Sequence, residues 1–152
     1  MYSWIDNILD GINEIYSPIN IYDLYDILEI EIQSLEKNNI LLRGNESFYY
    51  RNFLGREVVF IRNDLNIYLE KFILAHELGH AILHTYVYEA AFNKDLINIG
   101  KLEKQANYFS FKLLNIDLDP IEFEGFTIEQ VASSLYLPKV YISNNNLLTT
   151  IL

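Results

Sequence analysis

The segment from residue 69 to residue 83 most constrains the fold, because it is the most apolar part of the chain with helical spacing. All three histidines of the protein lie in this segment or directly after it, at His76, His80 and His84. A buried helix tolerates polar side chains only where each of them has a partner. The chain must therefore bring another segment, or a bound ion, against these groups.

The spacing of the histidines points to a metal ion. His76 and His80 are four residues apart, so their side chains project from adjacent turns of one helix face and can share one ion. Glu77 follows the first histidine and would face a water at the open coordination position, as in the H-E-x-x-H motif. The pattern predicts His76 and His80 as metal ligands and Glu77 as the general base. The alternative is that these three residues coincide by chance on a core helix, which would leave their polar side chains without partners.

A catalytic zinc site usually has three protein ligands, and this chain has no cysteine. The third ligand should therefore be a carboxylate, and the downstream candidates are Glu89, Asp95 and Glu103. Glu103 borders the inward stripe of a predicted helix, although its spacing also fits an ordinary exposed residue. Asn107 lies one turn further on the same face and could hold Glu103 or the neighbouring helix by a hydrogen bond. Two imidazoles and a carboxylate suit zinc best among the common divalent metals.

The role of His84 is left open by the spacing. His84 lies about 80° around the helix from His76 and one turn beyond His80. It could be a hydrogen-bonding partner of a ligand, a stabiliser of the tetrahedral intermediate, or a core histidine. A longer three-histidine motif is excluded, because Leu83 and Tyr86 occupy the positions that this motif requires to be glycine and histidine.

Charge and composition exclude several classes of protein. The formal net charge of -10 has the wrong sign for a protein that binds nucleic acid by neutralising phosphates. No basic leader and no apolar run of about 20 residues is present, so we expect no membrane span and a cytoplasmic location. The first 36 residues carry eight acidic and no basic side chains. They could attract a basic DNA-binding partner, or they could simply form a solvated face.

The chain is expected to fold as one α+β domain over residues 1–152, mostly helical with a small antiparallel sheet against the motif helix. Residues 1–38 are interpreted as two acidic helices, the second beginning at an Asn20 cap and ending near Lys37. Residues 39–119 would contain the sheet and the metal-site helices. The expected strands centre on residues 40–42, 48–50 and 58–61. Residues 120–152 would be helical.

The last helical pair, residues 127–143, has a helix-turn-helix shape, with Thr127 to Gln130 as a capping box. A DNA-reading second helix needs basic side chains, and only Lys139 is available there. We therefore interpret this segment as a packing or protein-contact element with no direct role in nucleic-acid binding.

These residues resemble the ImmA/IrrE family of metallopeptidases. The family carries a Phe-x-x-Ala-His-Glu-Leu-Gly-His core, often followed by Leu-His, and then a Glu-x-x-Ala-Asn-x-Phe helix. The matching positions here are Phe72, Ala75 to His80, Leu83 and His84, and then Glu103, Ala106, Asn107 and Phe109. The resemblance covers roughly residues 20–115 and favours Glu103 as the third ligand. Gln105 departs from a position that is often acidic in the family.

The resemblance implies a zincin-like fold, in which the motif helix packs under a small sheet with a peptide-binding edge. It also implies a zinc endopeptidase, a hydrolase that cleaves a helix-turn-helix transcriptional repressor and so derepresses a phage or mobile element. The alternative from another class is an anti-repressor that sequesters its partner through a metal-stabilised surface without proteolysis. The presence of Glu77 favours the enzyme, because a structural zinc has no use for a base beside an open position.

Overall fold

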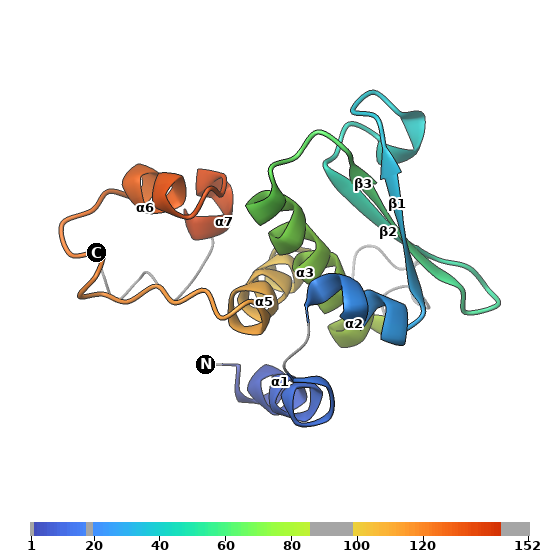
Figure 1. The fold of residues 1–152 in the computed structure, drawn as a ribbon, viewed down its shortest axis with the longest axis horizontal. Helices are drawn as coiled ribbons and strands as arrows, with labels where there is room; N and C mark the ends of the chain where they lie inside the picture. The colour runs from blue at the N-terminus through green and yellow to red at the C-terminus, as the bar shows by residue number, and fades with distance from the viewer. Residues whose placement is uncertain (1, 18–19, 86–98, 144–152) are drawn as a thin grey trace.

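The computed structural model describes residues 2–17, 20–85 and 99–143 of the chain. Its helices are α1 (Ser3–Tyr16), α2 (Ile21–Ile27), α3 (Ile67–Leu83), α5 (Ile99–Leu113), α6 (Ile128–Ser134) and α7 (Lys139–Ser143). Its strands are β1 (Ile30–Leu35), β2 (Ser47–Arg51) and β3 (Glu57–Arg62). Helices α3 and α5 lie side by side at the centre, with the sheet on one side and α6 and α7 at the opposite end (Figure 1). This arrangement confirms the expected α+β class.

The sheet has the strand order β1-β3-β2. Strands β2 and β3 form an antiparallel hairpin in which Tyr49 pairs with Val59. Strand β1 pairs with β3 in parallel, with Ile32 opposite Val59. The sheet is therefore mixed, although its hairpin has the antiparallel pairing that the sequence predicts. Strand β2 is an edge strand, and it also packs against α3.

The prediction of one long second helix is wrong beyond residue 27. Asn20 caps α2 as expected, since its side chain accepts a hydrogen bond from the backbone N–H of Asp23. The helix ends after Ile27, however, and Glu29 takes a left-handed conformation with φ 58°. Residues 30–35 then pair with β3 as a strand. Two alternating isoleucines, Ile30 and Ile32, suit that pleated position, and a non-local partner outweighs the local helical spacing.

Residues 40–42 also differ from the expectation. They form a 3₁₀ helix capped by Asn39, whereas the sequence pattern predicts a strand. Arg43 follows with φ 52°, and Gly44 with φ 77°, so the chain turns here before β2 begins. The other two expected strands, at residues 48–50 and 58–61, lie inside β2 and β3 as predicted.

Helix α3 is the central element of the core. The Asn66 side chain caps it by accepting a hydrogen bond from the backbone N–H of Leu69. Eleven of its 17 residues are buried, because sheet and helices cover it on several sides. Figure 1 shows α2 and the sheet flanking α3 while α5 runs against it. Such a helix is a rigid support for side chains that must hold fixed positions.

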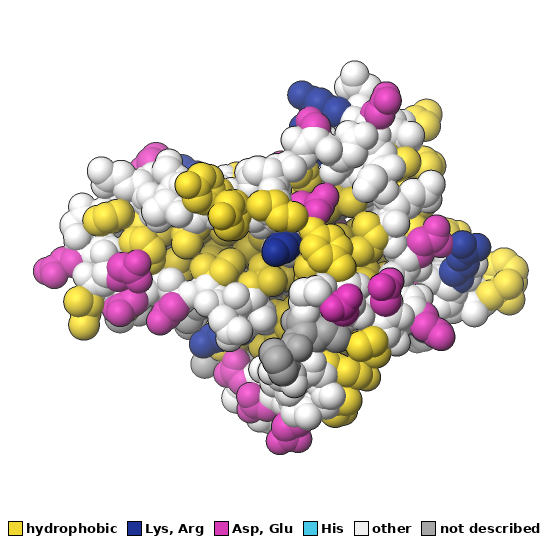
Figure 2. All heavy atoms as spheres, in the orientation of Figure 1, with side chains coloured by type: hydrophobic (Ala, Val, Ile, Leu, Met, Phe, Trp, Pro, Cys, Tyr) yellow, Lys and Arg dark blue, Asp and Glu magenta, His cyan; other side chains and the backbone are white. Residues whose placement is uncertain are grey.

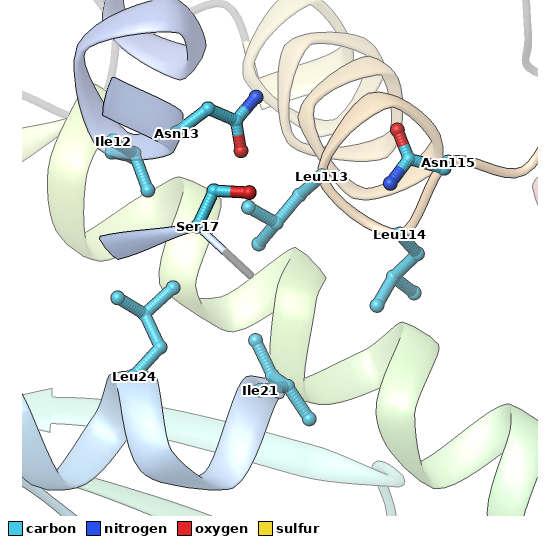
Figure 3. Close-up of a pocket in the computed structure, with 8 residues that line it drawn as sticks. All are labelled: Ile12, Asn13, Ser17, Ile21, Leu24, Leu113, Leu114 and Asn115. Carbon is cyan, nitrogen blue, oxygen red and sulfur yellow. The ribbon is translucent and has the colours of Figure 1, made fainter. Parts of the chain in front are cut away.

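Helix α1 packs on α5, where the hydroxyl group of Tyr108 donates a hydrogen bond to Asp6 at 2.8 Å. A small pocket of about 140 Å³ lies where α1, α2 and the end of α5 meet (Figure 3). Aliphatic side chains such as Ile12, Leu24 and Leu113 line it together with Asn13 and Asn115. None of the histidines belongs to this pocket, so it is separate from the predicted metal site.

The predicted final helical pair is present in the described part of the chain as α6 and α7. Thr127 and Gln130 form the expected capping box at the start of α6. Lys139, at the start of α7, forms an ion pair with Glu129.

Figure 2 shows Asp and Glu side chains spread around one face of the molecule, with Lys and Arg at a few separate points. No helix in the described residues is both long and apolar enough to cross a membrane.

Candidate metal centre

The motif helix places the two histidines as their spacing predicts. The Nε2 atoms of His76 and His80 lie 3.1 Å apart, and their rings meet nearly edge to face. His76 is buried, and the side chain of His80 is only 14% exposed. A four-residue separation on α3 thus brings two nitrogen atoms to a single point.

Glu103 approaches this point from α5. One of its carboxylate oxygens lies 3.1 Å from Nε2 of His76, and the other lies 3.0 Å from Nε2 of His80. Among the described residues, these three side chains are the ones grouped closely enough to hold a metal ion. The other two candidates for the third ligand, Glu89 and Asp95, lie outside the described residues.

Asn107 stands behind His76. Its Oδ1 atom lies 2.8 Å from Nδ1 of His76, and its side chain is buried. Because an amide oxygen only accepts hydrogen bonds, Nδ1 of His76 carries the proton in this contact. The other ring nitrogen, Nε2, is the one that faces Glu103 and His80.

His84 stands behind His80. The Nδ1 atoms of the two rings lie 2.9 Å apart, and Nε2 of His84 lies 2.9 Å from Oε1 of Gln105. His84 is thus engaged at both ring nitrogens and is almost completely buried. These contacts favour the first of its three open roles, a hydrogen-bonding partner of the candidate ligand. They disfavour a role as a donor to substrate, because no ring nitrogen remains for it.

The pKa values of these groups follow from burial and from their neighbours. Burial alone would lower the pKa of His76, but the hydrogen bond with Glu103 and the charges of Glu77 and Glu103 raise it overall. Burial tends to raise the pKa of Glu103, and its hydrogen bonds with the two imidazoles nevertheless hold that pKa well below its usual range. Burial lowers the pKa of His84 to about 4, so His84 is neutral at neutral pH.

The donor set fits a divalent cation of the zinc type. The Nε2 atoms of two imidazoles and the two oxygens of one carboxylate converge, with neighbouring N and O atoms 3.0–3.1 Å apart. A divalent cation placed between the three side chains would replace the protons of the imidazole contacts and balance the charge of the carboxylate. At about 2.0 Å from zinc, tetrahedral ligand atoms lie roughly 3.3 Å apart, which is close to the observed separations.

Glu77 faces the site from the same helix and is held from the sheet. The hydroxyl group of Ser47, the first residue of β2, donates a short hydrogen bond to Oε1 of Glu77. Glu77 is only 8% exposed, and this contact joins two elements that are 30 residues apart in sequence. Sequence reasoning missed Ser47, because a serine at the start of a strand carries no local signal of such a partner.

Tyr141, on α7, also borders the site. Its ring centroid lies 6.2 Å from that of His76 and 4.9 Å from that of Phe72. Its hydroxyl group donates a hydrogen bond to Oε2 of Glu46 at 3.0 Å. Burial, together with the charges of Glu46, Glu77 and Glu103, raises the pKa of Tyr141, so the hydroxyl keeps its proton. The sequence leaves the second stabiliser of the oxyanion unassigned among His84 and 12 tyrosines, and Tyr141 is a tyrosine whose ring lies beside the candidate ligand His76.

The comparisons with known proteins agree with this geometry. The family model described as the IrrE N-terminal-like domain, peptidase M78, matches residues 27–141. The chain is 29% identical over 124 residues to "Metallopeptidase ImmA" of Bacillus subtilis (strain 168), covering 78% of this chain and 70% of that protein. It is 26% identical over 121 residues to "Uncharacterized immunity region protein 2" of Bacillus phage phi105, covering 77% of this chain and 73% of that protein. No solved structure matches it.

The family match extends from the end of α2 to α7, and so includes the sheet, both ligand-bearing helices and Tyr141. Within that range, the H-E-x-x-H motif on α3 and Glu103 on α5 are brought together as one His-His-Glu group. The chain therefore belongs to the ImmA/IrrE family.

Proposed function

We propose that the protein is a zinc-dependent endopeptidase in which His76, His80 and Glu103 hold the metal and Glu77 is the general base. The observation that carries this proposal is the convergence of two Nε2 atoms and one carboxylate beside a buried glutamate. A purely structural metal site would not need a base at the position of Glu77. When bound, the ion would supply Lewis acidity that polarises a carbonyl group and acidifies water.

Glu77 accepts a proton from the attacking water at its carboxylate and passes that proton to the leaving amine. Ser47 fixes one carboxylate oxygen of Glu77, so the base does not turn away from the site. The hydroxyl group of Tyr141 donates to Glu46 in this structure, and with substrate bound it would turn that hydrogen bond to the oxygen of the scissile carbonyl, where negative charge develops. Asn107 holds the His76 imidazole through Nδ1, which leaves Nε2 of that ring turned toward the metal position.

The substrate that we propose is a protein, specifically a helix-turn-helix transcriptional repressor whose cleavage derepresses a phage or mobile element. Two observations support this choice. One relative is named as a metallopeptidase, and another as a protein of a phage immunity region. The acidic surface of this chain also suits a basic DNA-binding partner better than it suits DNA itself.

The test uses a purified helix-turn-helix repressor from the element that carries this gene, incubated with wild-type protein or with Glu77→Gln. Intact-mass spectrometry would detect fragments, and elemental analysis would give the zinc content of both proteins. We expect zinc in both and discrete fragments only with the wild type. Binding and derepression without fragments, equal in the two proteins, would instead indicate an anti-repressor that sequesters its partner.

A further inference from the structure

A chain of two hydrogen bonds runs from His80 through His84 to Gln105, the first part-buried and the second buried. The Nδ1 atoms of His80 and His84 lie 2.9 Å apart, and Nε2 of His84 lies 2.9 Å from Oε1 of Gln105. His84 is 1% exposed and Gln105 is 5% exposed, so water does not compete for these contacts. The backbone N–H of His84 also donates to the carbonyl oxygen of His80 at 3.1 Å, which places His84 at the C-cap of α3.

The acceptor at the end of this chain sets the proton positions along it. The amide oxygen of Gln105 cannot donate, so Nε2 of His84 carries a proton. A neutral His84 then has a lone pair at Nδ1, and Nδ1 of His80 must donate to it. Nδ1 of His80 thus keeps its proton, and Nε2, which lies 3.0 Å from Glu103, is the nitrogen that can give up its proton to a metal ion.

We propose that His84 and Gln105 are positioning residues that fix the tautomer and the ring orientation of His80, so that its Nε2 atom is ready to bind the metal. This inference rests on the proposed metal site and assigns a role to two side chains outside the ligand set. The observation behind it is that both ring nitrogens of His84 are engaged, Nδ1 with His80 and Nε2 with Gln105. The orientation of the His76 ring is fixed in a similar way by one hydrogen bond to Asn107.

The test measures zinc affinity by competition with a chromophoric chelator, using the full chain. We expect His84→Ala and Gln105→Leu each to weaken zinc binding by about 10 to 100-fold, the usual effect of losing such a partner of a ligand. The matched control is Ser110→Ala. Ser110 is equally buried on α5, but its hydroxyl group donates to the carbonyl oxygen of Ala106 and not to a histidine. Zinc affinity in His84→Ala and Gln105→Leu within twofold of the wild type would overturn the inference.

A second measurement does not depend on metal binding or activity. Long-range ¹H–¹⁵N spectra of the metal-free protein distinguish protonated from unprotonated ring nitrogens. We expect His80 to be protonated at Nδ1 and His84 at Nε2, and Gln105→Leu to give mixed tautomers while the fold is retained. A wild-type chain that binds no zinc would refute the proposed function. Even then, the spectra would test this inference separately. A His80 that is protonated at Nε2 and not at Nδ1 would overturn it.

Discussion

A Cβ atom added to Gly79 would lie 3.2 Å from Cδ1 of Phe109 and 3.3 Å from the Cα atom of Ala106. Gly79 on α3 therefore faces α5 so closely that a side chain at this position would need α5 to move by a few tenths of an ångström. The close approach of these helices is what brings His76 and His80 to Glu103. Glycine costs about 1 kcal/mol relative to alanine inside a helix, and the close helix packing compensates for this cost.

Gly79→Ala should destabilise the fold despite the better helix propensity of alanine. The methyl group requires Phe109 and Ala106 on α5 to shift by a few tenths of an ångström, and overpacking of this kind typically costs about 1–3 kcal/mol. Gly11→Ala is the matched control, because a Cβ atom on Gly11 of α1 meets nothing within 4 Å. That variant should gain roughly 0.5–1 kcal/mol. Urea unfolding of the metal-free proteins measures both values, and equal stabilisation in the two variants would contradict the tight contact.

Removal of any one ligand should strip the metal from the protein. His76→Ala, His80→Ala and Glu103→Ala each remove one of three side chains whose facing N and O atoms lie 3.0–3.1 Å apart, leaving two ligands for the ion. Elemental analysis should find about one zinc per chain in the wild type and much less in each variant. Glu124→Ala removes an exposed glutamate outside the site and should keep a full complement. Normal zinc content in Glu103→Ala would show that another carboxylate is the third ligand.

Tyr141→Phe should slow cleavage without loss of zinc. Removal of one hydrogen-bond donor from a developing oxyanion typically lowers kcat by about 10² to 10³-fold, with KM less affected. Tyr22→Phe is the control, because the hydroxyl group of Tyr22 bonds to Glu70 and does not contact the histidines. Steady-state kinetics on the repressor would measure both variants. An unchanged kcat in Tyr141→Phe would mean that this hydroxyl group serves only to bind Glu46.

The contact between Tyr108 and Asp6 should make stability depend on pH in the alkaline range. Burial and the hydrogen bond to Asp6 raise the pKa of Tyr108 from 10.0 to about 12. Because the folded pKa is the higher one, the stabilisation is fully present below pH 10 and is lost as the pH rises toward 12. Tyr108→Phe should be less stable than the wild type at pH 8 by about 1 kcal/mol.

That difference between wild type and Tyr108→Phe should shrink steadily between pH 10 and pH 12. Chemical denaturation at several pH values measures it, and comparison with the variant removes the contribution of the other tyrosines. A difference that stays constant over this range would show that Tyr108 does not titrate differently in the folded and unfolded chain.

Local patterns account for the parts of the fold that the sequence predicts well. Helix α3 and the caps at Asn20 and Thr127 depend on side chains a few residues apart. The segment at residues 30–35 shows the opposite case. Its apolar residues fit helical spacing, yet it pairs with β3, which lies more than 20 residues downstream. The stability of a strand depends on its neighbours, so local spacing could not decide between the two structures.

The sequence by itself determined that His76 and His80 share one face of a helix with Glu77 between them, because the 3.6-residue period follows from backbone geometry alone. Only the tertiary structure decided which groups meet them. The packing of α3 on α5 brings Glu103, Gln105 and Asn107 to the imidazoles, and the sheet brings Ser47 to Glu77. These partners come from segments 20 or more residues away, and their positions depend on how whole helices and strands pack.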